Sequence, residues 1–228
     1  MPEIKLLNIC CMSFMASCKD KEFDLAIVDV PYGINMAARG NVGSERGFNK
    51  SGTKTYSIQR YAKKDWDKNA PNEDYFKELF RVSKNQIIWG ANHFISKIPF
   101  DSSCWIVWDK DNSGNYADCE LAWASFDTAV KLFKHRWNGM LQHDMSNKDE
   151  RTHPTQKPIR LYKWLLSTYA NEGDKILDTH GGSMSIAIAC HQIGFDLTLC
   201  EIDLDYYNAG VKRYNEAIKQ QTLFKYEI

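Results

Sequence analysis

The sequence predicts a doubly wound α/β fold, in which helices cover both faces of a mostly parallel sheet of seven strands. Two observations predict it. Short apolar runs that end in polar residues recur along the chain, and the last third alternates strand, helix, strand and helix, the order of a parallel βαβ unit. The 228 residues suit one domain with a substantial core, and 43% hydrophobic with 25% charged residues is a globular composition.

Each element is predicted from a local pattern. Helices are predicted where apolar residues recur at helical spacing between start and stop signals. These helices are Asn72–Ser83, Pro158–Ala170, Ser183–Gln192 and Asp205–Lys219. Strands are predicted at the apolar runs Phe23–Asp29, Gln86–Gly90, Cys104–Asp109, Glu120–Phe126, Thr128–Phe133, Lys175–Asp178 and Leu197–Glu201. The long polar stretch from Asn35 to Lys68 has the length of a functional or disordered loop.

Charge and cysteine content exclude several classes of protein. Lysine plus arginine and aspartate plus glutamate both number 29, so a nucleic acid partner requires basic residues that cluster locally. The seven cysteines are odd in number and include no C-x-x-C pair, which argues against a disulfide framework and a zinc site. Residues 1–18 contain no long apolar stretch, so we expect no signal peptide, no membrane span and a cytoplasmic protein.

A pattern typical of nucleoside-cofactor sites lies in the last third of the chain. One predicted strand ends in Asp178, the next turn contains Gly181 and Gly182, and the following strand ends in Glu201. Glycines let a ligand approach the backbone, and the second acid can accept hydrogen bonds from both ribose hydroxyls. An acid beside the first strand suits a cofactor with an ammonium group. The pattern alone is weak, because G-x-G-x-x-G is missing and acids at strand ends are common.

The segment Asp29-Val30-Pro31-Tyr32 also follows a predicted strand, at the edge of the sheet where ligands gather. Pro31 forces Val30 into an extended conformation, which can aim the Val30 carbonyl outward beside the Asp29 carboxylate. Two acceptors side by side suit an amino group, which has two N–H donors. Tyr32 supplies a flat face for a base taken out of a duplex. The alternative is a strand followed by a proline turn in which Tyr32 only packs.

A third motif, Thr152-His-Pro-Thr-Gln-Lys-Pro158, comes directly before a predicted helix and by itself is an ordinary helix start with Thr155 as the cap. In combination, D-V-P-Y at 29–32, H-P-T-Q-K-P at 153–158 and L-D-T-H-G-G-S at 177–183 resemble the amino-methyltransferases of DNA. The order is similar to their permuted β group, whose catalytic motif D-P-P-Y precedes a glycine motif resembling D-P-F-x-G-S-G. The resemblance covers nearly the whole chain.

The resemblance implies a single domain with the Rossmann-like class I methyltransferase fold. It comprises a catalytic half (1–126), a short target-recognition insert (127–151) and a cofactor half (152–228). The implied methyl donor is S-adenosylmethionine, the implied substrate is double-stranded DNA, and no metal is required. The implied catalytic residues are Asp29, Val30, Pro31 and Tyr32. The implied cofactor-binding residues are His153, Thr155, Lys157, Asp178, His180, Gly181, Gly182, Ser183 and Glu201, although Lys157 could equally be a solvated side chain.

The implied reaction begins when the target base leaves the duplex and stacks on Tyr32. Asp29 and the Val30 carbonyl would hold its amino group while the methyl group moves. Asp29 favours adenine N6, since an initial Ser would have favoured cytosine N4, but the motif does not separate the two. Val30 replaces a family proline whose carbonyl alone is needed. Met184 replaces a glycine and would narrow the cofactor pocket, so a catalytically inactive nucleic-acid-binding relative is the alternative of another class.

Two basic segments are candidates for DNA contact. Between Arg39 and Lys64 the chain has seven basic residues and one acid, Glu45, directly after the catalytic strand. The alternative for this segment is a flexible, solvated loop. The second segment lies in the insert, where Asn138 could bind a base edge. The candidate residues are Arg39, Arg46, Lys50, Lys54, Arg60, Lys63, Lys64, Arg136 and Asn138. The sequence leaves open the recognition site, a partner nuclease and whether the protein is a monomer or a homodimer.

Overall fold

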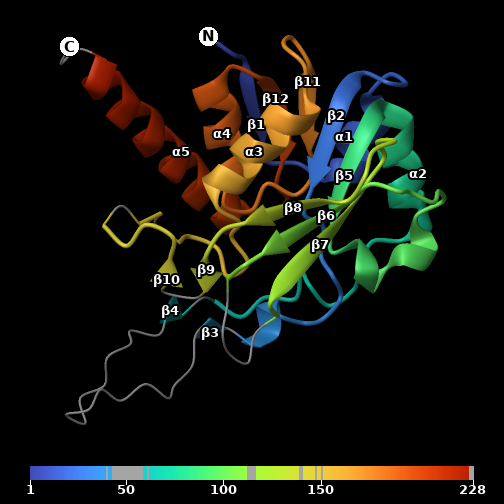
Figure 1. The fold of residues 1–228 in the computed structure, drawn as a ribbon, viewed down its shortest axis with the longest axis horizontal. Helices are drawn as coiled ribbons and strands as arrows, with labels where there is room; N and C mark the ends of the chain where they lie inside the picture. The colour runs from blue at the N-terminus through green and yellow to red at the C-terminus, as the bar shows by residue number, and fades with distance from the viewer. Residues whose placement is uncertain are drawn as a thin grey trace.

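The computed structural model describes residues 1–39, 41–42, 59–60, 62–111, 117–138, 141–146, 148–149 and 151–225. In this part of the chain an eight-stranded sheet has the order β1-β12-β11-β2-β5-β7-β6-β8 (Figure 1). Its strands are β1 (Ile4–Leu7), β2 (Phe23–Val28), β5 (Ser83–Trp89), β6 (Trp105–Asp109), β7 (Cys119–Ala124), β8 (Lys131–Lys134), β11 (Lys175–Asp178) and β12 (Asp196–Cys200).

The strands of this sheet run in one direction except for β7. The five strands from β1 to β5 in sheet order pair in parallel, β7 pairs antiparallel with both β5 and β6, and β8 returns to parallel pairing with β6. The mostly parallel, doubly wound sheet predicted from the sequence is therefore confirmed. It contains one strand more than expected, because β1 was not predicted.

Helices cover both faces of the sheet, and strand β2 is accordingly buried on both faces. Leu25 and Ile27 join the core that packs against α3 (Ile159–Tyr169) and α4 (Ser185–Ile193). Ala26 and Val28 join a second core formed with α1 (Cys11–Ser17) and α2 (Glu73–Val82). Neighbouring residues of a strand point to opposite faces, so the part of β2 that is buried on both faces, Leu25–Val28, is apolar throughout.

Local signals account for the helix positions. Asn72 caps α2 by accepting a hydrogen bond from the Tyr75 amide at 3.1 Å, and Glu73 and Asp74 lie in the positively charged first turn. Gly194 ends α4 in the left-handed conformation. Helix α5 (Leu204–Lys225) packs on α4. None of the helices in the described residues has the length and apolarity needed to cross a membrane.

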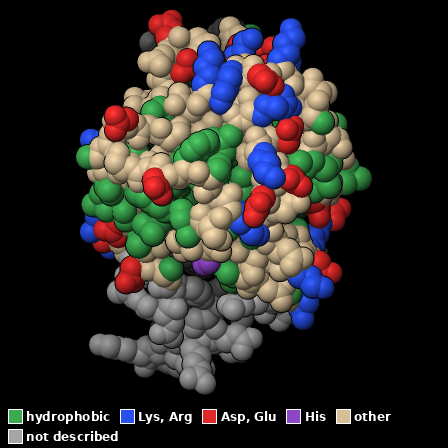
Figure 2. Space-filling view, turned by 90° about the vertical axis from the view of Figure 1, so that its right-hand side faces the viewer, with side chains coloured by type: hydrophobic (Ala, Val, Ile, Leu, Met, Phe, Trp, Pro, Cys, Tyr) green, Lys and Arg blue, Asp and Glu red, His purple; other side chains and the backbone are tan. Residues whose placement is uncertain are grey.

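Short elements complete the described fold. The antiparallel ribbons β3 (Asn41–Val42) with β4 (Gln59–Arg60) and β9 (Trp137–Asn138) with β10 (Leu141–Gln142) are drawn below the sheet in Figure 1. Three short 3-10 helices, η1 (Ala37–Arg39), η2 (Ala91–His93) and η3 (Ile95–Lys97), lie in connecting segments. Figure 2, which views the right-hand side of Figure 1, shows groups of hydrophobic side chains at the surface.

Candidate active site

The ends of two neighbouring strands bring the predicted catalytic and cofactor motifs together. β2 and β11 are paired in parallel, with Ala26 opposite Leu177, so Asp29 follows β2 at the same edge of the sheet at which Asp178 ends β11. Glu201 follows β12, the next strand along, at this edge as well. A doubly wound sheet binds its ligands at the carboxyl ends of its strands. One site can therefore include residues of both motifs.

The Asp29 carboxylate is bound by two side chains that come from different parts of the chain. Lys157 Nζ lies 2.6 Å from Asp29 Oδ1, and the Tyr32 hydroxyl donates a hydrogen bond to the same oxygen at 2.9 Å. Lys157 also donates to the Tyr32 hydroxyl at 3.2 Å. The Lys157 side chain is only 3% exposed, so the solvated alternative for this residue is wrong.

Two charged residues of this cluster were not singled out in the sequence. Glu120 Oε2 lies 3.0 Å from Lys157 Nζ, and Glu120 Oε1 lies 2.5 Å from Lys110 Nζ. Lys110 follows β6, whereas Glu120 lies near the start of β7. Because β7 runs opposite to its neighbours, its first residues lie at the edge where the other strands end. Recognising Glu120 requires the strand direction, which no local pattern encodes.

Burial and charge act in opposite directions on this cluster. Burial would raise the pKa of Glu120, but the ammonium groups of Lys157 and Lys110 lower it to about 2. Burial would lower the pKa of Lys157, but Asp29 and Glu120 raise it. The pKa of Asp29 is raised by burial, and Lys157 opposes that effect. The acidic and basic groups thus stabilise each other's charged forms.

The ring of Tyr32 has a fixed place above the end of β5. It stacks on the His93 ring with a centroid distance of 5.1 Å and an interplanar angle of 18°. Gly90 ends the strand with φ of +70°, and a Cβ atom there would lie 2.1 Å from Tyr32 Cε1. Only glycine fits this contact without moving the ring. Sequence reasoning placed Gly90 at a strand end and missed its role under Tyr32.

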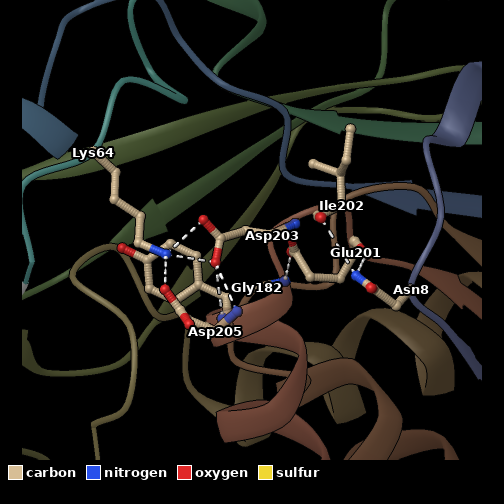
Figure 3. Close-up of polar contacts among 8 residues, drawn as sticks. Asn8, Lys64, Gly182, Glu201, Ile202, Asp203 and Asp205 are labelled. Atoms are coloured by element: carbon tan, nitrogen blue, oxygen red, sulfur yellow. Dashed lines mark hydrogen bonds and ion pairs between the residues drawn. The ribbon is translucent and has the colours of Figure 1, made fainter.

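The Glu201 carboxylate is held by backbone groups in the glycine turn and at the start of α5 (Figure 3). Glu201 Oε2 accepts a hydrogen bond from the Gly182 amide at 2.7 Å, and Oε1 accepts one from the Asp203 amide at 2.8 Å. Gly182 has φ of +48°, in the left-handed region that favours glycine. The next residue, Ile202, is 67% exposed and presents an apolar side chain beside this carboxylate.

Asp178 is a buried acid, and few described groups stabilise the negative charge of its carboxylate. Its side chain accepts a hydrogen bond from the His180 amide at 2.9 Å, and the residue is 2% exposed. Burial raises its pKa to about 8, and the nearby carboxylates of Asp29 and Glu201 act in the same direction. No described cation forms an ion pair with it. A cationic group of a ligand would therefore stabilise the ionised form.

The last part of the long polar stretch packs over this cofactor region. Lys64 Nζ lies 2.5 Å from Asp203 Oδ1 and 2.8 Å from Asp205 Oδ2, as Figure 3 shows. Trp66 contacts both His153 and Tyr206, with centroid distances of 5.2 and 6.4 Å. The buried Asp67 accepts hydrogen bonds from the Gly33 and Met36 amides. Residues 64–67 thus join the loop after Tyr32 to the start of α5.

The remaining predicted cofactor residues line the same region. The ring of His153 faces Gly182, at which a Cβ atom would lie 3.8 Å from it, and burial lowers the His153 pKa to about 3. Thr155 hydrogen-bonds the His153 ring at 3.2 Å and does not cap α3, whose first turn follows Pro158. The side chains of His180 and Ser183 bond with Thr179 and Ser185, respectively.

Met184, which replaces a glycine of the family motif, has its side chain in the core of the protein. It adopts the left-handed conformation with φ of +56°, and its side chain is fully buried. That side chain lies against α5, where a Cβ atom on Gly210 would be 2.8 Å from Met184 Cγ. The space for the methionine is therefore provided by a glycine in the facing helix.

The predicted DNA-binding residues are only partly described. Arg46, Lys50 and Lys54 lie outside the described residues, as do the side chains of Arg39, Arg60 and Asn138. Lys63 is exposed. Arg136 is 52% exposed and lies 2.8 Å from Asp111 Oδ2, while the charge of Lys64 is already matched by two acids.

Comparisons with known proteins agree with this geometry. The described fold is that of the class I methyltransferases. A solved structure of M1.HpyAVI with S-adenosylmethionine has a TM-score of 0.57 at 18% identity and covers 94% of this chain and 100% of that chain. The PvuII DNA methyltransferase, described as cytosine-N4-specific, has a TM-score of 0.57 at 10% identity, and the match covers 96% of this chain and 93% of that chain.

Sequence relatives of this chain include DNA methyltransferases. Residues 110–212 match the family model described as DNA methylase. The type II methyltransferase M2.MboI of Moraxella bovis is 25% identical over 90% of this chain and 85% of its own, and M2.DpnII of Streptococcus pneumoniae is 24% identical over 88% and 85%. In sequence, the chain is similar to DNA methyltransferases of the N6-adenine/N4-cytosine family, and the structural neighbour M1.HpyAVI was solved with S-adenosylmethionine.

Proposed function

We propose that this protein transfers a methyl group from S-adenosylmethionine to N6 of adenine in double-stranded DNA, after the target base has left the duplex. One observation carries the proposal: Asp29 and Asp178 lie at the same edge of two adjacent parallel strands. A cofactor bound at Asp178 and a base bound at Asp29 would share one site. Such proximity converts methyl transfer into a step within one complex.

The residues at the ends of β11 and β12 suit this cofactor. Asp178 is a buried acid that lacks a described cationic partner, which fits the ammonium group of the methionine part. Glu201 can accept hydrogen bonds from the ribose, and the exposed Ile202 offers an apolar surface for the purine ring. When bound, the cofactor supplies an electrophilic methyl group on a sulfonium sulfur. The protein's part is to bind and orient the two reactants.

Asp29 has the chemistry needed to activate an exocyclic amino group. The lone pair of that nitrogen is delocalised into the ring, so the group is a weak nucleophile. A hydrogen bond to the carboxylate draws the N–H toward the acceptor and favours localisation of the lone pair on nitrogen. A negative charge fixed beforehand also stabilises the positive charge that develops as the new N–C bond forms.

Tyr32 is suited to receive the extrahelical base. Its ring is partly exposed, and His93 stacks on it. Unstacking the target base costs a few kcal/mol, which contacts with the flipped base and the DNA backbone must offset. We propose that Lys63, Arg136 and the rest of the insert 127–151 provide some of these contacts. Adenine is favoured over cytosine because the motif begins with Asp29, and the product will distinguish them.

The proposal is tested by expressing the protein in a host that lacks DNA methylation. Single-molecule sequencing of the host DNA reports the modified base and its sequence context, and mass spectrometry of nucleosides identifies N6-methyladenine or N4-methylcytosine. Asp29→Ala should abolish incorporation of tritium from labelled cofactor, and Asp29→Asn should lower it severely. Turnover near the wild-type rate in either variant contradicts the role of Asp29. If the product is N4-methylcytosine, the proposed role of Asp29 still applies, but the substrate is cytosine and not adenine.

A further inference from the structure

Four alternating charges form a chain that ends on the catalytic carboxylate. They are Lys110, Glu120, Lys157 and Asp29, joined by N–O distances of 2.5, 3.0 and 2.6 Å. Each side chain is at most 22% exposed, and Lys157 in the middle is 3% exposed. Solvent therefore screens these interactions only partly. Lys157 comes from the segment before α3, whereas Glu120 and Lys110 come from the β6–β7 pair.

We propose that Lys157 and Glu120 are positioning residues for methyl transfer: they hold the Asp29 carboxylate through its Oδ1 oxygen and leave Oδ2 for the target amino group. The proposal rests on the proposed function, in which Asp29 binds that group. Neither residue needs to touch the DNA or the cofactor. Both act on the acceptor that does.

The hydrogen bonds on Asp29 support this division between its two oxygens. Lys157 and the Tyr32 hydroxyl both bond to Oδ1, and no described side chain bonds to Oδ2. The Asp29 side chain is 18% exposed, so it is not closed off from the site. Two partners on one oxygen fix the plane of the carboxylate. A target amino group at Oδ2 would find an acceptor that is already oriented.

The donors of Lys157 are fully engaged by this arrangement. An ammonium group has three N–H donors. Three acceptors lie within reach of Lys157 Nζ: Asp29 Oδ1 at 2.6 Å, Glu120 Oε2 at 3.0 Å and the Tyr32 hydroxyl at 3.2 Å. A bond from Lys157 to the cofactor carboxylate would break one of these contacts. The geometry therefore favours a role for Lys157 at Asp29 over its expected role at the cofactor.

Glu120 has a distinct electrostatic task. A lone ammonium at 2.6 Å would weaken Asp29 as an acceptor and repel the positive charge that develops on the target nitrogen. Glu120 offsets that charge, and Lys110 in turn offsets Glu120. The other titratable groups near Asp29 are Asp178 on β11, Tyr162 on α3, and Tyr32 with its stacking partner His93. Lys157 is the cation of this set that contacts Asp29.

The test measures the pH dependence of single-turnover methylation of unmethylated genomic DNA with tritiated cofactor. Lys157→Met leaves Asp29 buried without its cation, so the pH of half-maximal rate should rise by about 1–3. Glu120→Gln leaves the ammonium uncompensated, so the half-maximal pH should fall and the maximal rate should drop at least threefold. Lys157→Arg should restore the wild-type profile. Lys175→Met, an exposed lysine at the opposite end of β11, is the control.

Cofactor affinity distinguishes a role of Lys157 at Asp29 from a role at the cofactor. Calorimetry should give the same cofactor Kd, within twofold, for Lys157→Met and the wild type. An unchanged pH profile in Lys157→Met, or a weaker Kd with a normal rate at saturating cofactor, overturns the inference. If Lys157→Met does not fold, the charge-matched double variant Glu120→Gln with Lys157→Met is measured. It lacks the Lys157 contact to Asp29 Oδ1, so a wild-type maximal rate there also overturns the inference. Normal turnover in Asp29→Ala would instead disprove the proposed function, so the two failures are distinguishable.

Discussion

The buried acid Asp178 should lower the stability of the protein near neutral pH, and Asp178→Asn should relieve that cost. Its pKa is raised from 3.8 to about 8 by burial. The folded state therefore binds the proton more tightly than the unfolded state. The contribution of Asp178 to stability is therefore most favourable below pH 3.8, becomes less favourable as the pH rises from 3.8 toward 8, and is constant above that.

The magnitude follows from the difference between the two pKa values. At 1.36 kcal/mol per pKa unit, the destabilisation above pH 8 approaches about 5–6 kcal/mol. Asparagine keeps an acceptor for the His180 amide but buries an amide N–H₂ group, so we expect about half of this gain. For a domain of this size the gain corresponds to a rise in Tm of about 5–10 °C at pH 8.

Thermal unfolding followed by circular dichroism at pH 5, 6.5 and 8 measures the effect in the absence of cofactor. The Tm of Asp178→Asn should exceed that of the wild type by an amount that grows with pH. Asp127→Asn, at an exposed position, is the matched control. A difference in Tm that is independent of pH would refute the reasoning, because only titration of residue 178 supplies the pH dependence. The same substitution should weaken cofactor binding.

Three further outcomes are expected. Gly210→Ala should lower the free energy of unfolding measured in urea, because the new Cβ would lie 2.8 Å from Met184 Cγ. Without this contact, alanine in place of glycine would stabilise a helix by about 1 kcal/mol. Met184→Ala combined with Gly210→Ala should recover part of the lost stability. Gly90→Ala should lower turnover at least tenfold without changing the cofactor Kd, and Gly173→Ala, with φ of +88° but open space, should not. Lys63→Ala should reduce the salt dependence of DNA binding by about one counterion, whereas Lys64→Ala should leave it unchanged, since Asp203 and Asp205 already neutralise that ammonium.

Much of the parallel part of the fold could be predicted from local patterns. Runs such as Phe23–Val28 and Asp196–Cys200 are buried along most of their length, so composition alone marks them. β1 has four residues and lies at an edge, and α1 has no side-chain cap, so neither produces a strong local signal. Long, buried elements are encoded locally, while short elements depend on the neighbours that they pack against.

Some residues of the candidate site could also be predicted from local patterns, whereas others depend on contacts between distant segments. Asp29, Asp178 and Glu201 follow apolar runs and were predicted from that position. The pairing of Lys157 with Asp29 joins residues 128 positions apart in the chain, and no pattern in either segment specifies it. Glu120 belongs to the site because β7 runs against its neighbours. Contacts of this kind depend on topology, which single-sequence patterns describe poorly.

The pairing of β1 with β12 has a consequence for synthesis of the protein. Ile4 of β1 is the partner of Leu197 of β12, which is synthesised 193 residues later. The strand β11, on which Asp178 lies, pairs with the same β12. Contacts between residues so distant in the chain form late, since the intervening chain must first be made and ordered. During synthesis Asp29 is made long before Glu201, so a pocket that contains both residues cannot form until translation has passed Glu201. A chain whose translation stops before that point is therefore expected to lack a complete cofactor pocket.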